Sequence, residues 1–150
     1  MSATEAPRLP RVRPAVLADA AQLARLSAQL GYPERLDVFT ARLQRVLSLS
    51  EHALFVALDG GDVLGFIAGE RRLMIETGER VEIVALVVDE RARRRGIGQV
   101  LLAAVEQWAR DIGLPDLVVR SNVARSQSHP FYEGAGFERV KTQHVYRKRL

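Results

Sequence analysis

The sequence predicts an α/β domain in which helices cover the faces of a mixed β-sheet. Amphipathic stretches with helical periodicity alternate with short apolar runs that are rich in β-branched residues, and no internal repeat interrupts the alternation. The chain has 150 residues, of which 47% are hydrophobic and 27% charged, as in folded globular proteins. A chain of this length can bury one good core, so we expect a single domain over residues 1–150, with a flexible segment at 1–9.

The first half of the chain predicts a short strand, two helices and a hairpin. A strand is expected at 11–15 and a helix at 18–30, where leucines recur at helical spacing. A second helix is expected at 36–47, because its apolar residues share one helical face. Residues 53–72 form two strands around Gly60 and Gly61, since a tight turn needs residues that tolerate a positive φ.

The second half predicts a sheet that continues around one long helix. A hairpin near Gly78 leads into VEIVALVV, whose nearly continuous apolar residues indicate a central strand buried on both faces. The remaining expected elements are a helix at 97–112, a strand at 116–121, a short helix around 131–133, and closing strands at 137–142 and 144–150.

Composition excludes several kinds of chemistry. The chain has no cysteine, so a disulfide, a thiolate metal site and a cysteine nucleophile are impossible. The histidines form no ligand spacing with carboxylates, and we expect no metal. No apolar run approaches the roughly 20 residues that span a bilayer, and the N-terminus has no signal-peptide core, so we expect a cytoplasmic protein without a membrane partner.

The basic residues crowd one loop. Although the net charge is only +4, Arg91, Arg93, Arg94 and Arg95 lie together between the apolar strand and the long helix, followed by Gly96 and Gly98. A helix N-terminus offers unpaired N–H groups to an anion, and glycine lets the anion approach the backbone, which favours a phosphate. The pattern fits neither a phosphate-loop NTPase nor a dinucleotide fold. A solvated basic turn is the alternative. A nucleic-acid partner is not expected, because no helix face is basic with interleaved aromatics.

The segment Arg93 to Gly98 resembles the [QR]-x-x-G-x-[GA] signature of the GNAT superfamily of N-acetyltransferases. The strand before it, the helix after it and FYEGAGF at 131–137 are similar to the family in order and spacing, over essentially residues 10–150. The resemblance implies the GNAT fold, a mostly antiparallel mixed sheet of six to seven strands with a splayed parallel pair and about four helices. It implies acetyl-CoA as the cofactor and direct acetyl transfer to a primary amine of a small molecule or protein. A non-catalytic module that binds acyl-CoA is the alternative.

The resemblance also implies the cofactor site. Backbone amides from about Arg94 to Gln99 would hold the pyrophosphate, the amide of Val88 or a near neighbour would hold the acetyl carbonyl, and the pantetheine arm would run between the central strand and 116–121. The residues expected at the cofactor are Leu86, Val87, Val88, Arg93, Arg94, Arg95, Gly96, Ile97, Gly98, Gln99, Arg125 and Tyr132. Arg125 stands where the family commonly has an asparagine, so that contact is open.

Two residues are candidates for proton transfer. By the resemblance, Tyr132 occupies the place of the family's general-acid tyrosine; the alternative is an aromatic ring packed beside Phe131 and Phe137. Glu82 lies six residues before Val88, where some members carry a general base, and the alternative is a solvent-facing carboxylate or an ion-pair partner.

The segment 28–39 joins the first two helices, a region that often shapes the acceptor pocket in this family. Tyr32 and Glu34 are therefore expected to contact the substrate, although helix packing and capping would explain them equally well. The closing strands would also allow a homodimer.

Overall fold

The computed structural model describes residues 10–125 and 128–150, which divide after Arg120 into two units. The first unit contains β1 (Arg11–Pro14), α1 (Ala20–Gln29), α2 (Leu36–Leu47), β2 (His52–Asp59), β3 (Asp62–Met74), β4 (Gly78–Val88), α3 (Ile97–Asp111) and β5 (Leu117–Val119). Single turns of 3-10 helix precede α1 at Leu17–Asp19 and α3 at Glu90–Ala92. The second unit contains α4 (Ser128–Gly134).

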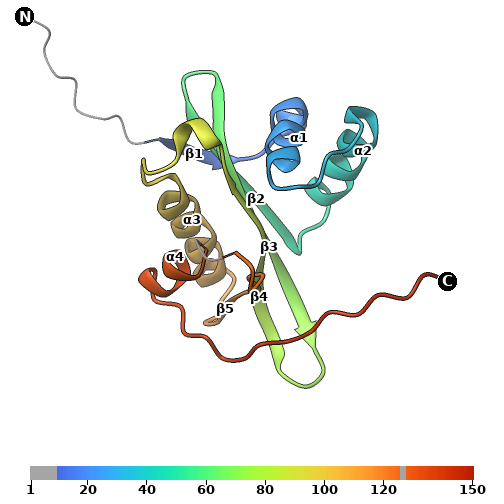
Figure 1. Ribbon diagram of the computed structural model, residues 1–150, viewed down its shortest axis with the longest axis vertical. Coiled ribbons are helices and arrows are strands. Elements are labelled where there is room, and N and C mark those ends of the chain that lie inside the picture. The colour runs from blue at the N-terminus through green and yellow to red at the C-terminus, as the bar shows by residue number, and fades with distance from the viewer. Residues whose placement is uncertain (1–9, 126–127) are drawn as a thin grey trace, which may run out of the picture. The chain divides into compact units, whose positions relative to one another are not determined.

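The strands of the first unit form one sheet in the order β1-β2-β3-β4-β5 (Figure 1). The first four strands are antiparallel neighbours, whereas β5 returns through α3 and lies parallel to β4. The parallel pairing joins only Val81–Ile83 to Leu117–Val119. Within the described chain, β4 continues beyond Ile83 with no strand on its β5 side. The predicted central strand and splayed parallel pair are therefore confirmed.

Helices pack on both faces of the sheet. On one face, α1 and α2 cover a core that includes Leu23, Leu26, Val56, Phe66 and Val87. On the other face lies α3, whose buried side chains include Ile97, Leu101 and Val105 (Figure 1). None of the helices in the described ranges has the length and apolar character that crossing a bilayer requires.

A glycine of β3 allows α3 to approach the sheet. A Cβ atom built on Gly65 would lie 2.7 Å from the carbonyl oxygen of Val87 and 3.2 Å from side-chain carbons of both Ile97 and Leu101. The backbone oxygen cannot move away without disturbing the pairing of β3 with β4. A side chain at Gly65 would therefore displace both the long helix and the end of β4.

The C-terminal part of the prediction is wrong. Residues 137–142 and 144–150 contain no strand, residues 138–150 are exposed, and the sheet of the described chain has five strands instead of six to seven. Branched and aromatic residues such as Val140, Val145 and Tyr146 favour a strand, but a strand forms only where a second backbone pairs with its N–H and C=O groups. This preference does not specify that neighbour.

The other predicted elements are confirmed, with differences at their ends. The helix expected at 18–30, for example, divides into a 3-10 turn and α1. The flexible segment expected at 1–9 lies outside the described residues, and the single domain over 1–150 stays a prediction.

Replacing Gly65 with alanine should lower the free energy of unfolding by about 1–3 kcal/mol, the usual cost of overpacking a filled core. Urea denaturation of Gly65→Ala measures this loss. Gly61→Ala is the matched control, because a Cβ there meets nothing within 4 Å; we expect a change within about 0.5 kcal/mol, as at ordinary surface positions. Equal effects of the two substitutions would contradict the packing argument.

Candidate functional site

The start of α3 presents a row of unpaired backbone amides. The first hydrogen bond of the helix runs from the N–H of Val100 to the carbonyl of Gly96, at 3.2 Å. Since the first four N–H groups of a helix have no partner within it, the amides from Gly96 to Gln99 are available to an anion. Arg94 and Gly96 both adopt left-handed conformations, with φ of 68° and 75°. Such turns direct successive N–H groups into a concave anion site.

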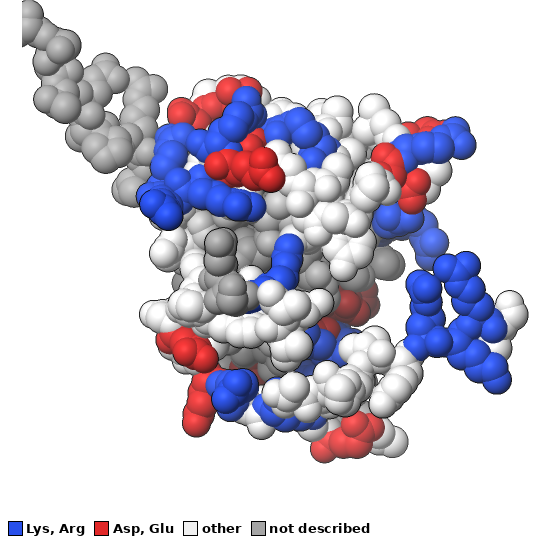
Figure 2. All heavy atoms as spheres, in the orientation of Figure 1, with Lys and Arg blue, Asp and Glu red and all other residues white. Residues whose placement is uncertain are grey.

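Cationic side chains surround this helix start. Arg93, Arg94 and Arg95 are exposed, and Figure 2 shows basic side chains gathered with acidic ones over this part of the surface. Arg95 lies 3.3 Å from a carboxylate oxygen of Asp59. Within the described ranges, Arg93 and Arg94 form no ion pair. The predicted cofactor residues 93–99 thus combine the unpaired guanidinium groups of the loop with the unpaired N–H groups at the start of α3. Together these groups suit a phosphate.

A β-bulge interrupts the pairing of β3 with β4. Ala68 lies opposite Ala85, whereas the next residue, Gly69, lies opposite Ile83, so Val84 has no partner across the ladder. Its side chain is 47% exposed. Because residues of a strand face their two neighbours alternately, one extra residue reverses which backbone groups face which side.

Because of this reversal, backbone N–H and C=O groups at the end of β4 point toward the edge of the strand that β5 leaves unpaired. Before the bulge, the N–H of Val81 donates to Asp116 on the β5 side, at 3.2 Å. After it, the N–H of Asp89 donates to Leu64 on the β3 side, at 2.7 Å. Leu86 and Val88 therefore direct their N–H and C=O groups toward the edge that β5 leaves free. Val87 faces β3 with its backbone and the core with its side chain.

A buried carboxylate that the sequence analysis missed lies directly after β4. Asp89 is fully buried and accepts hydrogen bonds from Arg25 Nη1 at 2.9 Å, from Arg91 Nη2 at 3.0 Å and from the backbone N–H of Arg91 at 3.1 Å. The hydrogen bond from the Arg91 guanidinium, aided by those from the Arg91 backbone N–H and from Arg25, outweighs the effect of burial and holds the pKa of Asp89 well below its usual range. Asp89 thereby joins α1 to the loop that leads into α3.

Glu82 is an ion-pair partner and not a solvent-facing carboxylate. It is 4% exposed, with Oε2 at 2.6 Å from Arg72 Nη1 and Oε1 at 3.0 Å from Arg120 Nε. Glu82 lies opposite Val118 in the last part of the parallel pairing, one residue before that pairing ends. The carboxylate therefore sits where β4 and β5 begin to separate. Its role as a base stays a prediction.

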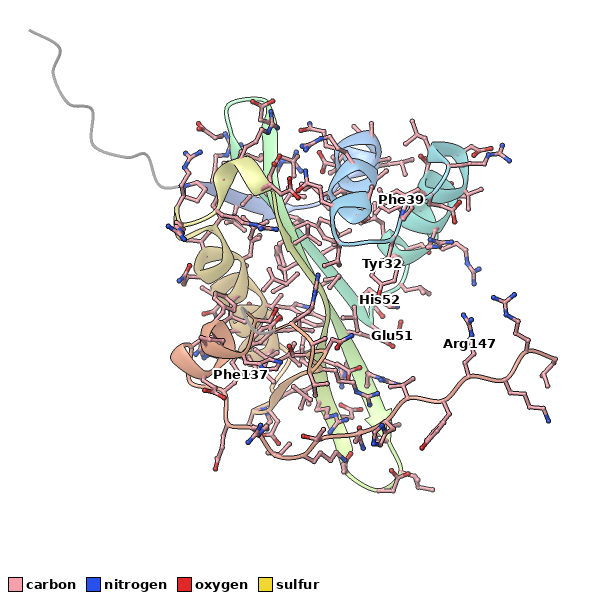
Figure 3. The ribbon with its side chains drawn as sticks, viewed as in Figure 1. Tyr32, Phe39, Glu51, His52, Phe137 and Arg147 are labelled. Carbon is pink, nitrogen blue, oxygen red and sulfur yellow. The ribbon has the colours of Figure 1, made fainter. Side chains whose placement is uncertain are left out.

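The residues expected at the acceptor lie between α1 and α2. Tyr32 is 71% exposed, and Figure 3 shows it projecting from this connection on the side where Glu51 precedes β2 and His52 begins it. Glu34 accepts a hydrogen bond from the N–H of Arg35 at 2.9 Å and lies 3.5 Å from Arg42. These contacts tie Glu34 to the start of α2 without capping the helix, and the substrate contact of both residues stays a prediction.

Arg125 and Tyr132 belong to the second unit, and their expected contacts with the cofactor stay predictions. The Tyr132 ring makes edge contacts with Phe131 and Phe137, at centroid distances of 5.3 and 5.6 Å. Burial raises the pKa of the Tyr132 phenol, and the charge of Arg125 opposes that shift. The packing alternative thus describes the ring, while the role of the hydroxyl stays a prediction.

A metal site would require several close ligands. Over residues 10–125 and 128–150, no group of three or more histidine, aspartate or glutamate residues could hold a metal ion.

Comparisons with known proteins agree with this geometry. A model of the acetyltransferase (GNAT) family matches residues 19–137. The aminoglycoside N(6′)-acetyltransferase type 1 of Stenotrophomonas maltophilia is 32% identical to this chain, with 94% of each chain covered. The enzyme of the same name from Serratia marcescens is 30% identical and covers 73% of this chain and 79% of its own. The solved structure of the aminoglycoside N-acetyltransferase AAC(6′)-Iy in complex with CoA has the same fold, with a TM-score of 0.85 at 24% identity, covering 97% of this chain and 100% of that one.

Replacing Asp89 with asparagine should lower the free energy of unfolding at pH 7 by about 1–3 kcal/mol, because two guanidinium groups lose their charged partner while the amide oxygen can still accept from the N–H of Arg91. The pKa of Asp89 is lowered by folding, so its stabilisation is present above the unfolded pKa of about 3.9 and is lost as the pH falls toward the folded value. The difference between the parent protein and Asp89→Asn should therefore shrink below about pH 4. Urea denaturation at several pH values measures it.

Glu90→Gln removes the neighbouring exposed carboxylate and serves as the control, with little effect expected. A difference between the parent protein and Asp89→Asn that stays constant down to pH 2 would show that the charge of Asp89 does not contribute.

Proposed function

The chain belongs to the acetyltransferase (GNAT) family and is an N-acetyltransferase; we propose that it transfers the acetyl group of acetyl-CoA directly to a primary amine of a small molecule. The observation that carries the proposal is the bulge at Val84. It directs the N–H groups of Leu86 and Val88 toward the open edge of β4, on the strand that leads directly into the anion-binding start of α3. One continuous segment, from β4 to the start of α3, would thus offer N–H groups both to the acetyl group and to the pyrophosphate of acetyl-CoA.

The residues of the loop fit the cofactor. The amides from Gly96 to Gln99 would hold the pyrophosphate, and Arg93 and Arg94 would add contacts to the phosphates. When bound, acetyl-CoA supplies an activated thioester. The amide of Val88, or that of Leu86, would donate to the acetyl oxygen and stabilise the charge that develops there.

The proton balance assigns roles to two side chains. In the reaction the amine nitrogen forms a bond to the acetyl carbon while the bond from that carbon to sulfur breaks. Glu82, through water, would take the proton that the amine loses. Tyr132 would give a proton to the departing sulfur; a phenol with the ordinary pKa of about 10 is already protonated at neutral pH, and burial raises the pKa of Tyr132 further.

The relatives support a small-molecule acceptor. Those that match most of this chain are named for acetylation of aminoglycosides, which are small amines. A GNAT-fold module that binds acyl-CoA without turnover is the competing function, and the release of CoA thiol with a panel of amines separates the two.

Acetyl-CoA at about 100 times its dissociation constant should stabilise the protein by about 2.7 kcal/mol. For a chain of this size the melting temperature should rise by about 5–11 °C, at roughly 2–4 °C per kcal/mol. Gly98→Glu should abolish the rise, because a carboxylate at the second position of α3 repels phosphate while suiting the helix dipole. Differential scanning calorimetry with and without ligand measures both.

Gln107→Glu places the same charge on the exposed face of α3 far from its start, and it should keep the full rise. A parent protein whose melting temperature does not respond to acetyl-CoA would end the proposal.

Replacing Glu82 with glutamine should lower turnover near pH 7 by about 10² to 10⁴, the range for a positioned proton acceptor. The loss should be smaller at pH 9 and above, because more of an alkyl ammonium with a pKa of about 10.4 is then already deprotonated. Steady-state rates across pH test this. Glu79→Gln, which alters an exposed carboxylate of the same strand, is the control. A loss that is equal at every pH would assign Glu82 a structural role only.

Replacing Tyr132 with phenylalanine keeps the ring contacts with Phe131 and Phe137 and removes the hydroxyl. A contact that strengthens toward the transition state affects turnover more than binding, so turnover should fall by about 10 to 10³ while cofactor affinity changes less than about threefold. Titration calorimetry and a thiol-release assay measure the two quantities. Full activity of Tyr132→Phe would mean that another group protonates the sulfur.

A further inference from the structure

We propose that the acceptor amine carries a carboxylate close to its amino group, and that Arg72, Arg80 and Arg120 recognise this carboxylate. The inference rests on the proposed function, because it specifies the acceptor of the same site. It depends on a group of charged side chains at the point where β4 and β5 separate.

The register of the strands places these side chains on one face of the sheet. Cross-strand partners share a face, and Arg72 lies opposite Arg80 while Glu70 lies opposite Glu82. Val118 lies opposite Glu82 on the other side, so Arg120, two residues further along the same strand, shares that face too. The contact between Arg120 and Glu82 agrees with this placement.

The same face is covered by α1 and α2 farther along the strands. Phe66 and Val87 are cross-strand partners there and belong to the core beneath those helices. Along β4 the charged group comes first, at Arg80 and Glu82, and the open edge and the helix-covered part of this face follow after the bulge. An amine that approaches this edge on the α1 and α2 face must pass these charges.

Positive charge exceeds negative charge in this group. Glu82 already pairs with two guanidinium groups: its Oε2 accepts a hydrogen bond from Arg72, whereas its Oε1 lies 3.0 Å from Arg120 Nε and accepts no hydrogen bond from the described residues. Arg80 forms no ion pair with any described residue, and its buried Nε atom has no hydrogen-bond partner among those residues. Three guanidinium groups thus face two carboxylates, of Glu70 and Glu82.

A buried donor without an acceptor costs free energy, and a ligand that supplies the acceptor recovers it. A carboxylate is the natural match, because its two oxygens fit the planar fork of a guanidinium group. The same ligand must offer an amine to Glu82, which accepts its proton in the proposed reaction. An amine next to a carboxylate satisfies both demands, whereas an amine that carries only further positive charges meets repulsion from the guanidinium groups.

The test compares amines that differ only in the carboxylate. Glycine, glutamate and lysine are each assayed against the corresponding amide, with neamine as a polycation without a carboxylate. We expect kcat/KM to be at least about tenfold higher for the best acid than for its amide, which corresponds to about 1.4 kcal/mol. An α-amide makes the amine less basic and so favours its neutral form, which biases the comparison against this expectation.

Three variants assign the preference to its residues. Arg72→Gln and Arg120→Gln should bring the ratio of acid to amide close to one, with unchanged affinity for acetyl-CoA by titration calorimetry. Arg80→Gln should lower the ratio as well, and it breaks no ion pair of the described chain, so it still tests the proposal if the other two variants fail to fold. Arg71→Gln alters an arginine of the same hairpin whose partner is Glu79, and it should preserve the ratio and the turnover.

The outcomes separate the two proposals. If the protein acetylates the amides or neamine as well as it acetylates the acids, or if the preference survives in all three variants, the carboxylate inference is wrong and the acetyltransferase proposal stands. If acetyl-CoA produces no thermal shift and no amine is acetylated, the proposed function fails and the inference fails with it.

Discussion

The bulge at Val84 is the constraint on which the candidate site depends. One unpaired residue in β4 reverses the direction of the backbone groups between Val81 and Asp89. Before it, β4 pairs with β5; after it, Leu86 and Val88 face an edge with which no described strand pairs. An unpaired strand edge inside a sheet normally invites another strand. Here β5 ends at Val119, and in the proposed function the open edge is where the cofactor hydrogen-bonds.

The loop after β4 is held by contacts from a distant part of the chain. Asp89 reaches Arg25 of α1, while the N–H of Glu90 donates to the side chain of Gln29 at 3.1 Å. The helix α1, which covers the core that contains Phe66 and Val87, therefore also fixes the first residues of the loop between β4 and α3. Close packing and hydrogen bonding act on the same short segment, so the amides at the start of α3 are oriented before any ligand arrives.

The first unit has two clusters of charged residues, one exposed at the start of α3 and one around the buried Glu82 where β4 and β5 separate. Around the start of α3, exposed arginines face solvent and free amides, which suits an anion such as a phosphate. Where β4 and β5 separate, Glu82 is buried between two guanidinium groups. A buried ion pair gains little stability over an apolar pair of similar size, so its presence at the edge of the proposed active site is more readily explained by recognition and proton transfer than by folding.

The sequence by itself determined the parts that depend on local properties. Periodicity identified α2 and α3, the glycine pair at 60 and 61 marked the first hairpin, and the arginine and glycine run marked the loop before α3. These predictions succeed because secondary-structure propensity, turn conformation and helix polarity depend on residues that are close together in the sequence. The family resemblance, carried by the same run, indicated the splayed pair of strands.

Only the tertiary structure decided what depends on residues far apart in the chain. No local pattern places Arg25 on Asp89 or Arg120 on Glu82, since each contact exists only after the sheet and its helices have assembled. The bulge also has no sequence signature, because an extra residue is defined by what lies opposite it on β3. The predicted closing strands are absent for the same reason. Residues 137–150 include branched and aromatic residues that favour strands, yet a strand needs a second backbone to pair with, and residue preference does not specify that backbone.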